Sequence, residues 1–82
     1  MRAAADTSTD TVHFRLHVGG HVIRCVVTSE LLCSVFHSED TPAGWLACFE
    51  ANQIAFVRKA LRRYRTDGVA PVKLHSADWH SL

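Results

Sequence analysis

The stretch from His13 to Cys25, HFRLHVGGHVIRC, holds three histidines and one cysteine at intervals of four residues. Imidazole nitrogens and thiolate sulfurs are the usual ligands of zinc, so these residue types raise the question of a metal site. If the segment were a helix, four-residue spacing would bring all four side chains onto one face. Whether they can bind a metal together therefore depends on the secondary structure.

The same stretch has the pattern of a β-hairpin, which separates these side chains. Apolar residues alternate with polar ones on both sides of Gly19-Gly20, and glycines readily take the positive φ of a tight primed turn. Cys25 then points into the core, while His13 and His17 point to the opposite face. We therefore predict no metal site in this stretch and no cofactor elsewhere in the chain.

The other chemically capable residues do not predict a catalytic site. LHSADWH and FHSED bring histidine, serine and acid together in sequence, but a catalytic triad needs residues that converge from separate elements. Cys33 and Cys48 lie among apolar residues in predicted helices, where a thiol is expected to pack rather than to react. We therefore expect a protein that is not an enzyme.

Basic side chains remain as candidates for contact with a partner or an anion. One cluster lies near the end of a predicted helix and comprises Arg58, Lys59, Arg62, Arg63 and Arg65. The simpler interpretation, which we favour, is a solvated helix end, where the helix dipole favours cations. The second cluster lies on the polar face of the predicted sheet, together with Val22 and Val26, and comprises His13, Arg15, His17, Arg24, Lys73 and His75.

The elements that must position these residues follow from periodicity and capping signals. Alternation predicts a hairpin over 12–27, and helical spacing predicts a short helix over 29–37 and a long amphipathic helix over 42–66. Thr28 and Thr41 are the expected N-caps, and Gly68 is the expected left-handed terminator of the long helix. A last strand follows Pro71, which marks it as an edge strand or a strand start.

These elements give the fold class and the domain organisation. We predict a flexible tail over residues 1–10 and a single α+β domain over residues 11–82. The predicted order is ββααβ, with a three-stranded antiparallel sheet and both helices on one face. A chain of 82 residues buries on the order of 60% of its unfolded surface, so association would add useful stability.

Composition restricts the cellular compartment. No apolar run approaches the roughly 20 residues that span a bilayer, and the start of the chain lacks the apolar core of a secretory signal. The three cysteines form no Cys-x-x-Cys pair, which fits buried thiols in a reducing compartment. We therefore expect a cytoplasmic protein without a membrane partner.

Four segments carry a resemblance to a known family. They are V-x-F at Val12 and Phe14, VIRCVVTSELL after the glycine turn, FEANQIAFVRKALRRY, and VKLHSADW. In this order and spacing they resemble the short bacterial proteins grouped as the domain-of-unknown-function family numbered 1488, from about Val12 to Trp79. The resemblance implies a compact α+β domain with no assigned activity, and it transfers no catalytic residue.

The basic sheet face suggests a contact surface, because the helices cannot cover both sides of the sheet. We expect a non-enzymatic interaction or regulatory module that forms a homodimer or binds another protein. The alternative is a nucleic-acid-binding accessory protein that uses the helix cluster and the basic sheet face. A pI near 7.8, with Phe14 pointing inward, favours the first of these two functions.

Overall fold

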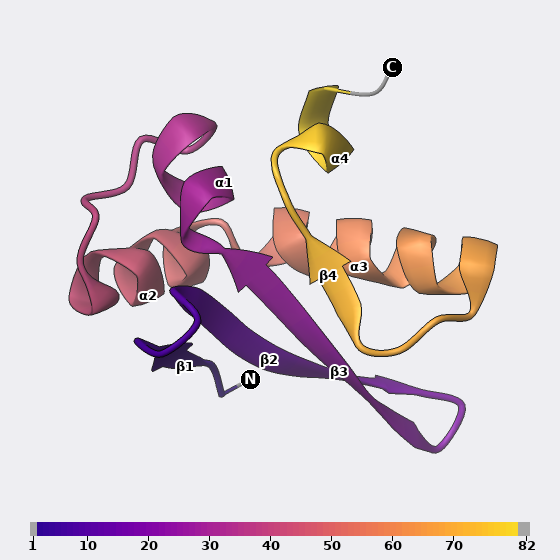
Figure 1. Ribbon diagram of the computed structural model, residues 1–82. Coiled ribbons are helices and arrows are strands. Elements are labelled where there is room, and N and C mark those ends of the chain that lie inside the picture. The colour runs from indigo at the N-terminus through magenta and orange to yellow at the C-terminus, as the bar shows by residue number, and fades with distance from the viewer. Residues whose placement is uncertain (1, 81–82) are drawn as a thin grey trace.

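A computed structural model describes residues 2–80 as a four-stranded sheet with four helices (Figure 1). The strands are adjacent in the order β1-β2-β3-β4. In chain order, the elements are β1 (Ala4–Asp6), β2 (Thr11–Val18), β3 (His21–Thr28), α1 (Ser29–Ser34), α2 (Pro42–Ala51), α3 (Gln53–Asp67), β4 (Val72–Leu74) and α4 (Ala77–His80).

The β2–β3 hairpin has the predicted register. Phe14 lies opposite Cys25 and Arg15 lies opposite Arg24. Gly19 and Gly20 have φ values of 55° and 81°, which are those of a primed two-residue turn. The hairpin prediction is confirmed because the turn and the hydrophobic alternation specify the same pairing.

The rest of the sheet differs from the prediction of three antiparallel strands. β4 pairs with β3 in parallel, because the connection between them is a helical crossover that returns the chain to the same end of the sheet. The sheet also has a strand that was not predicted, β1, which lies within the segment predicted as a flexible tail. Ala4–Asp6 form β1 and pair antiparallel with residues 11–13, so the tail prediction is wrong for these residues.

The helix predicted over 42–66 is two helices with a break at Asn52. This residue has φ −121° and ψ 22°, which is not helical. Its side-chain amide donates a hydrogen bond of 2.8 Å to the Cys48 carbonyl oxygen, which competes with continuation of the helix. The short helix ends at Ser34, earlier than predicted, and a further short helix, α4, follows β4.

The predicted helix boundaries at Thr28, Thr41 and Gly68 are confirmed. The Thr28 hydroxyl accepts a hydrogen bond of 3.2 Å from the Leu31 N–H, and the Thr41 hydroxyl accepts one of 3.0 Å from the Gly44 N–H. Gly68 has φ 63° and ends α3 in the left-handed conformation. Within residues 2–80, no helix is long and apolar enough to cross a membrane.

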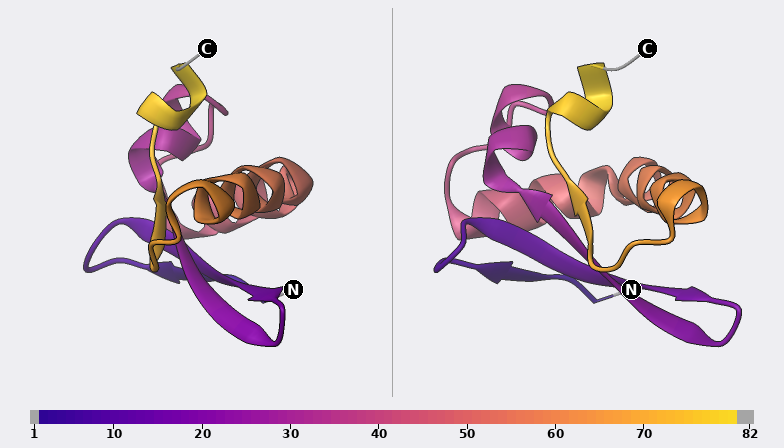
Figure 2. Two further views of the ribbon diagram at one scale, coloured as in Figure 1. Left: turned by 90° about the vertical axis from the view of Figure 1, so that its right-hand side faces the viewer. Right: turned by 45° about the vertical axis from the view of Figure 1, so that its right-hand side comes forward.

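The helices leave one face of the sheet uncovered. Figure 2 shows α2 and α3 on one side of the strands, while α1 and α4 lie beyond the ends of β3 and β4. The core lies between the sheet and α2–α3. There the Phe49 ring contacts the ring of Phe14 on one side and that of Phe56 on the other. Because side chains alternate along β2 and β3, every second residue of these strands points away from that core.

Candidate functional site

The uncovered face, here called the open sheet face, brings together five of the six residues predicted for it. Register places His13 beside Val26 and Val26 beside Lys73, so one row of side chains crosses three strands. Parallel rows pair Arg15 with Arg24 and His17 with Val22. Those five predicted residues are all exposed, and they are His13, Arg15, His17, Arg24 and Lys73.

The sixth predicted residue, His75, belongs to a different environment. It follows the end of β4, and its Nδ1 lies 3.4 Å from the Asp78 Oδ2. Its backbone N–H also donates to Asp78 Oδ2, at 2.9 Å. His75 therefore helps to hold the start of α4 instead of extending the row that contains Lys73.

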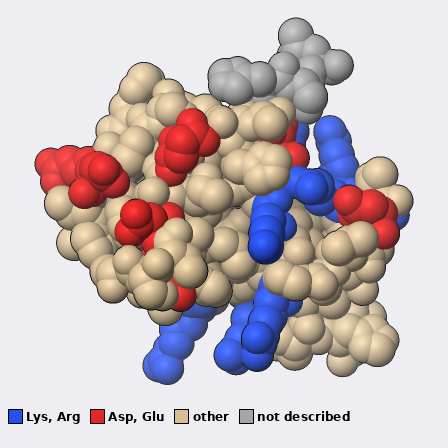
Figure 3. All heavy atoms as spheres, viewed as in Figure 1, with Lys and Arg blue, Asp and Glu red and all other residues tan. Residues whose placement is uncertain are grey.

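Positive charge on the open sheet face is largely uncompensated. Figure 3 looks onto this face and shows lysine and arginine side chains over its centre and lower edge, with most acidic side chains to the left. Arg15 and Arg24 have no ion-pair partner within residues 2–80. His13 is different, because its Nε2 lies 3.0 Å from the Thr11 hydroxyl and 3.5 Å from the Asp6 carboxylate.

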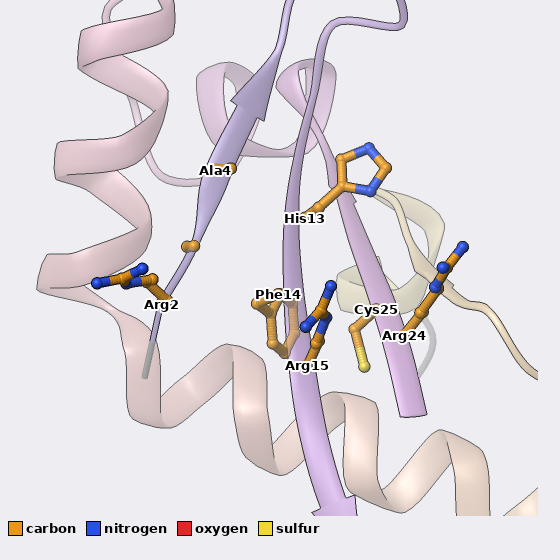
Figure 4. Close-up of a pocket in the computed structure, with 8 residues that line it drawn as sticks. Arg2, Ala4, His13, Phe14, Arg15, Arg24 and Cys25 are labelled. Carbon is orange, nitrogen blue, oxygen red and sulfur yellow. The ribbon is translucent and has the colours of Figure 1, made fainter. Parts of the chain in front are cut away.

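A hollow of about 460 Å³ lies where β1 separates from β2. Among the described residues, its lining comes from the first three strands and the two residues before β1 and includes no acid: Arg2, Ala3, Ala4, His13, Phe14, Arg15, Arg24 and Cys25. Figure 4 shows Arg15 and Arg24 extending in the same direction from β2 and β3. Arg2 stands on the other side, with its guanidinium turned away from β2.

Arg2 was missed because it lies in the segment predicted as a tail. The sequence signal around it is weak, since residues 3–6 offer only three alanines and one acid to a strand assignment. The pairing of β1 with β2 then places Arg2 near Arg15, thirteen positions away in the sequence. That proximity is a tertiary effect.

The predicted helix cluster is divided between structural and exposed side chains. The Arg63 guanidinium donates to the Asp78 carboxylate at 2.8 Å and to the Lys73 carbonyl at 2.9 Å, which ties α3 to β4 and α4. Lys59 Nζ lies 5.4 Å from the centre of the Trp79 ring. The remaining side chains of the cluster are exposed and have no ion-pair partner in the described part of the chain: Arg58, Arg62 and Arg65.

The cysteines have environments that suppress thiolate formation. Burial raises the pKa of Cys25 to about 11, and its side chain lies in the core. Burial also raises the pKa of Cys33 and of Cys48, and for Cys33 the negative charge of Asp40 adds to the effect. Since the thiolate is the nucleophile and the metal-binding form, these shifts disfavour both roles at neutral pH.

The histidine–cysteine quartet of the hairpin does not converge. His13 and His17 point to the open sheet face, while Cys25 is fully buried on the other side of the sheet. His21 is exposed beside the turn. Among the described residues, no group of three or more histidine, cysteine or acidic side chains is placed to hold a metal ion.

Comparison with known proteins identifies a family for the chain but assigns no role to any single residue. Neither the comparison with curated proteins nor the comparison with solved structures gave a match. A family model described as "Protein of unknown function (DUF1488)" matches residues 2–74, which include all four strands, α1, α2 and α3. The chain therefore belongs to the family of proteins of unknown function numbered 1488.

Proposed function

We propose that this protein is a non-enzymatic interaction module that binds an acidic segment of another protein on the open sheet face. The observation that carries the proposal is an uncovered face on which exposed cations, Arg15 and Arg24, have no ion-pair partner within residues 2–80. The same face carries an exposed apolar residue, Val22, which is 54% exposed. Such a surface favours a partner that supplies carboxylates and some apolar contact. The protein acts in the cytoplasm in this proposal, in keeping with its three free thiols.

A symmetric contact between two open sheet faces is disfavoured, because it would bring Arg15 and Arg24 of one copy against those of the other. The homodimer that the sequence suggests is therefore proposed to use a strand edge. β1 pairs with β2 only at residues 11–13, so within residues 2–80 the outer edge of β2 is unpaired from Phe14 to Val18. Native mass spectrometry that finds only monomer at high concentration would contradict this dimer.

Two double variants with the same charge change test the function of the open sheet face. Val22→Glu with Lys73→Glu alters that face outside the hollow, and Ile54→Glu with Arg62→Glu alters exposed positions on α3. The measurement is fluorescence anisotropy with a labelled peptide in which glutamates alternate with leucines. We expect binding that weakens steeply with added salt, is lost in the sheet variant and is retained in the helix variant.

The outcomes of this experiment separate the candidate surfaces. Equal loss of peptide binding in both variants, or no binding to the unaltered protein at low salt, would overturn the proposal. Both variants change only exposed side chains, so both should fold. Circular dichroism checks that they do.

A nucleic-acid-binding accessory role is the second candidate. Arg58, Arg62 and Arg65 favour it, because they are exposed and unpaired within the described residues. They project from α3, which covers the opposite side of the sheet from the open sheet face (Figure 2). Binding of a mixed-sequence oligonucleotide that is lost in the helix variant and kept in the sheet variant would support this role.

A further inference from the structure

The hollow beside β1 concentrates positive charge that the fold does not neutralise. Counted back from the two-residue turn, Arg15 and Arg24 form a non-hydrogen-bonded pair, in which Cα atoms are about 4.5 Å apart and side chains are close. Like charges directly opposite each other on a sheet are destabilising. Neither guanidinium has a hydrogen bond or an ion pair within residues 2–80.

We propose that this hollow is an oxyanion site for a phosphate monoester, with the Arg15 and Arg24 guanidinium groups as its direct contacts. The inference rests on the proposed function, because both arginines belong to the open sheet face, and it names the group which that face recognises. A bound dianion would turn the unfavourable arginine pair into a favourable one. Planar guanidinium groups also match phosphate oxygens in a two-pronged geometry.

The composition of the lining favours a phosphate over a single carboxylate. Within residues 2–80, three arginines line the hollow and no acid does, so the local charge favours a ligand with more than one negative charge. Arg2, which precedes β1, lines the other side of the hollow with its guanidinium turned away from β2 (Figure 4). A change in the rotamer of this long side chain would bring a third guanidinium toward the ligand. The volume of about 460 Å³ leaves room for the group that carries the phosphate.

The acid of β1, Asp6, has partners other than the two arginines. Hydrogen bonds from the Ser8 hydroxyl and backbone N–H to Asp6 Oδ1, at 2.6 and 2.9 Å, lower the pKa of Asp6. Its other oxygen faces the His13 ring at 3.5 Å. The carboxylate of Asp6 therefore interacts with Ser8 and His13. It forms no ion pair with Arg15 or Arg24, whose charges stay uncompensated within residues 2–80.

The test is a nuclear magnetic resonance titration of the full chain at constant ionic strength. The probes are inorganic phosphate, O-phosphoserine and acetate, and the signals are the backbone amides of the hollow and the Nε–H groups of Arg15 and Arg24. The site variant is Arg15→Gln with Arg24→Gln. Its matched control is Arg58→Gln with Arg62→Gln, which removes the same charge from α3.

We expect saturable shifts with both phosphate probes and binding that is at least about tenfold weaker in the site variant, with the control unchanged. Tighter binding of O-phosphoserine than of inorganic phosphate would identify a monoester as the source of the phosphate, and equal binding would identify free phosphate. No saturable shift in the unaltered chain, equal binding in the site variant, or acetate binding as tight as phosphate binding would each overturn the inference.

Failure of this inference can be told apart from failure of the proposed function. The peptide experiment alters Val22 and Lys73, which do not line the hollow. Peptide binding without phosphate binding would remove the phosphate site and leave the interaction surface. Phosphate binding without peptide binding would remove the interaction surface and leave the phosphate site.

Discussion

At the scale of single residues, the open sheet face carries two arginines where stability alone would favour neutral strand formers. Arg15 and Arg24 repel each other across the hairpin, and the structure places no acid against either within residues 2–80. Proteins commonly carry such locally unfavourable choices at functional sites. The pair is therefore better explained by a ligand than by folding.

The cost of this pair can be measured by a double-mutant cycle with Arg15→Thr and Arg24→Thr. Each single change relieves the same repulsion and adds a residue suited to strands, so each should raise the free energy of unfolding by about 0.2–1 kcal/mol. The double variant should gain less than the sum of the two single changes, and the coupling should shrink with added salt. Urea unfolding gives these values, and strict additivity would contradict the repulsion.

At the scale of elements, the hairpin turn determines which side chains share the open sheet face. Gly19 and Gly20 both have positive φ, and a Cβ atom at either position would meet no atom within 4 Å beyond the glycine and its two chain neighbours. Glycine is therefore favoured at these two positions because of the positive φ, and not because a side chain would collide with other parts of the protein. A shift of one residue in the pairing would send the arginines to the core and the core residues to solvent.

Two substitutions at Gly19 separate backbone conformation from every other effect. Gly19→Asn should be tolerated, because asparagine adopts positive φ with little strain, whereas Gly19→Val should cost about 1–2 kcal/mol of unfolding free energy. Thermal and urea unfolding of the two variants provide the measurement. If asparagine were as destabilising as valine, the left-handed conformation of Gly19 would not be the reason for the cost.

At the scale of the whole molecule, one aromatic cluster joins the elements. Phe56 contacts the rings of Phe49, Phe36 and Trp79 and is fully buried. The cluster connects α2 and α3 with the segment after α1 and with α4. A domain of this length has a total stability of about 4–12 kcal/mol, so loss of one such side chain removes a large share of it.

Phe56→Ala should therefore lower the free energy of unfolding by about 3–5 kcal/mol, through lost burial and the cavity left behind. Ile54→Ala, two positions away and 70% exposed, is the matched control and should change stability by no more than about 0.5 kcal/mol. Urea unfolding and near-ultraviolet circular dichroism report both effects. A small loss at Phe56 would show that the cluster repacks.

Features that depend only on neighbouring residues could be predicted from the amino-acid sequence. The hairpin register, the caps at Thr28 and Thr41 and the terminator at Gly68 follow from local periodicity and turn chemistry. The family membership also followed from motif order. These predictions succeed because side-chain alternation, capping and positive φ are properties of short segments.

Features that depend on contacts between distant residues could not be predicted from local patterns. The strand at Ala4–Asp6 is stabilised by pairing with β2, and the parallel direction of β4 follows from the crossover that precedes it. The break at Asn52 lets two helices cover the sheet where one long helix is predicted. The hollow, which Arg2 lines together with Arg15 and Arg24, exists because β1 joins the sheet, and no local pattern specifies that contact.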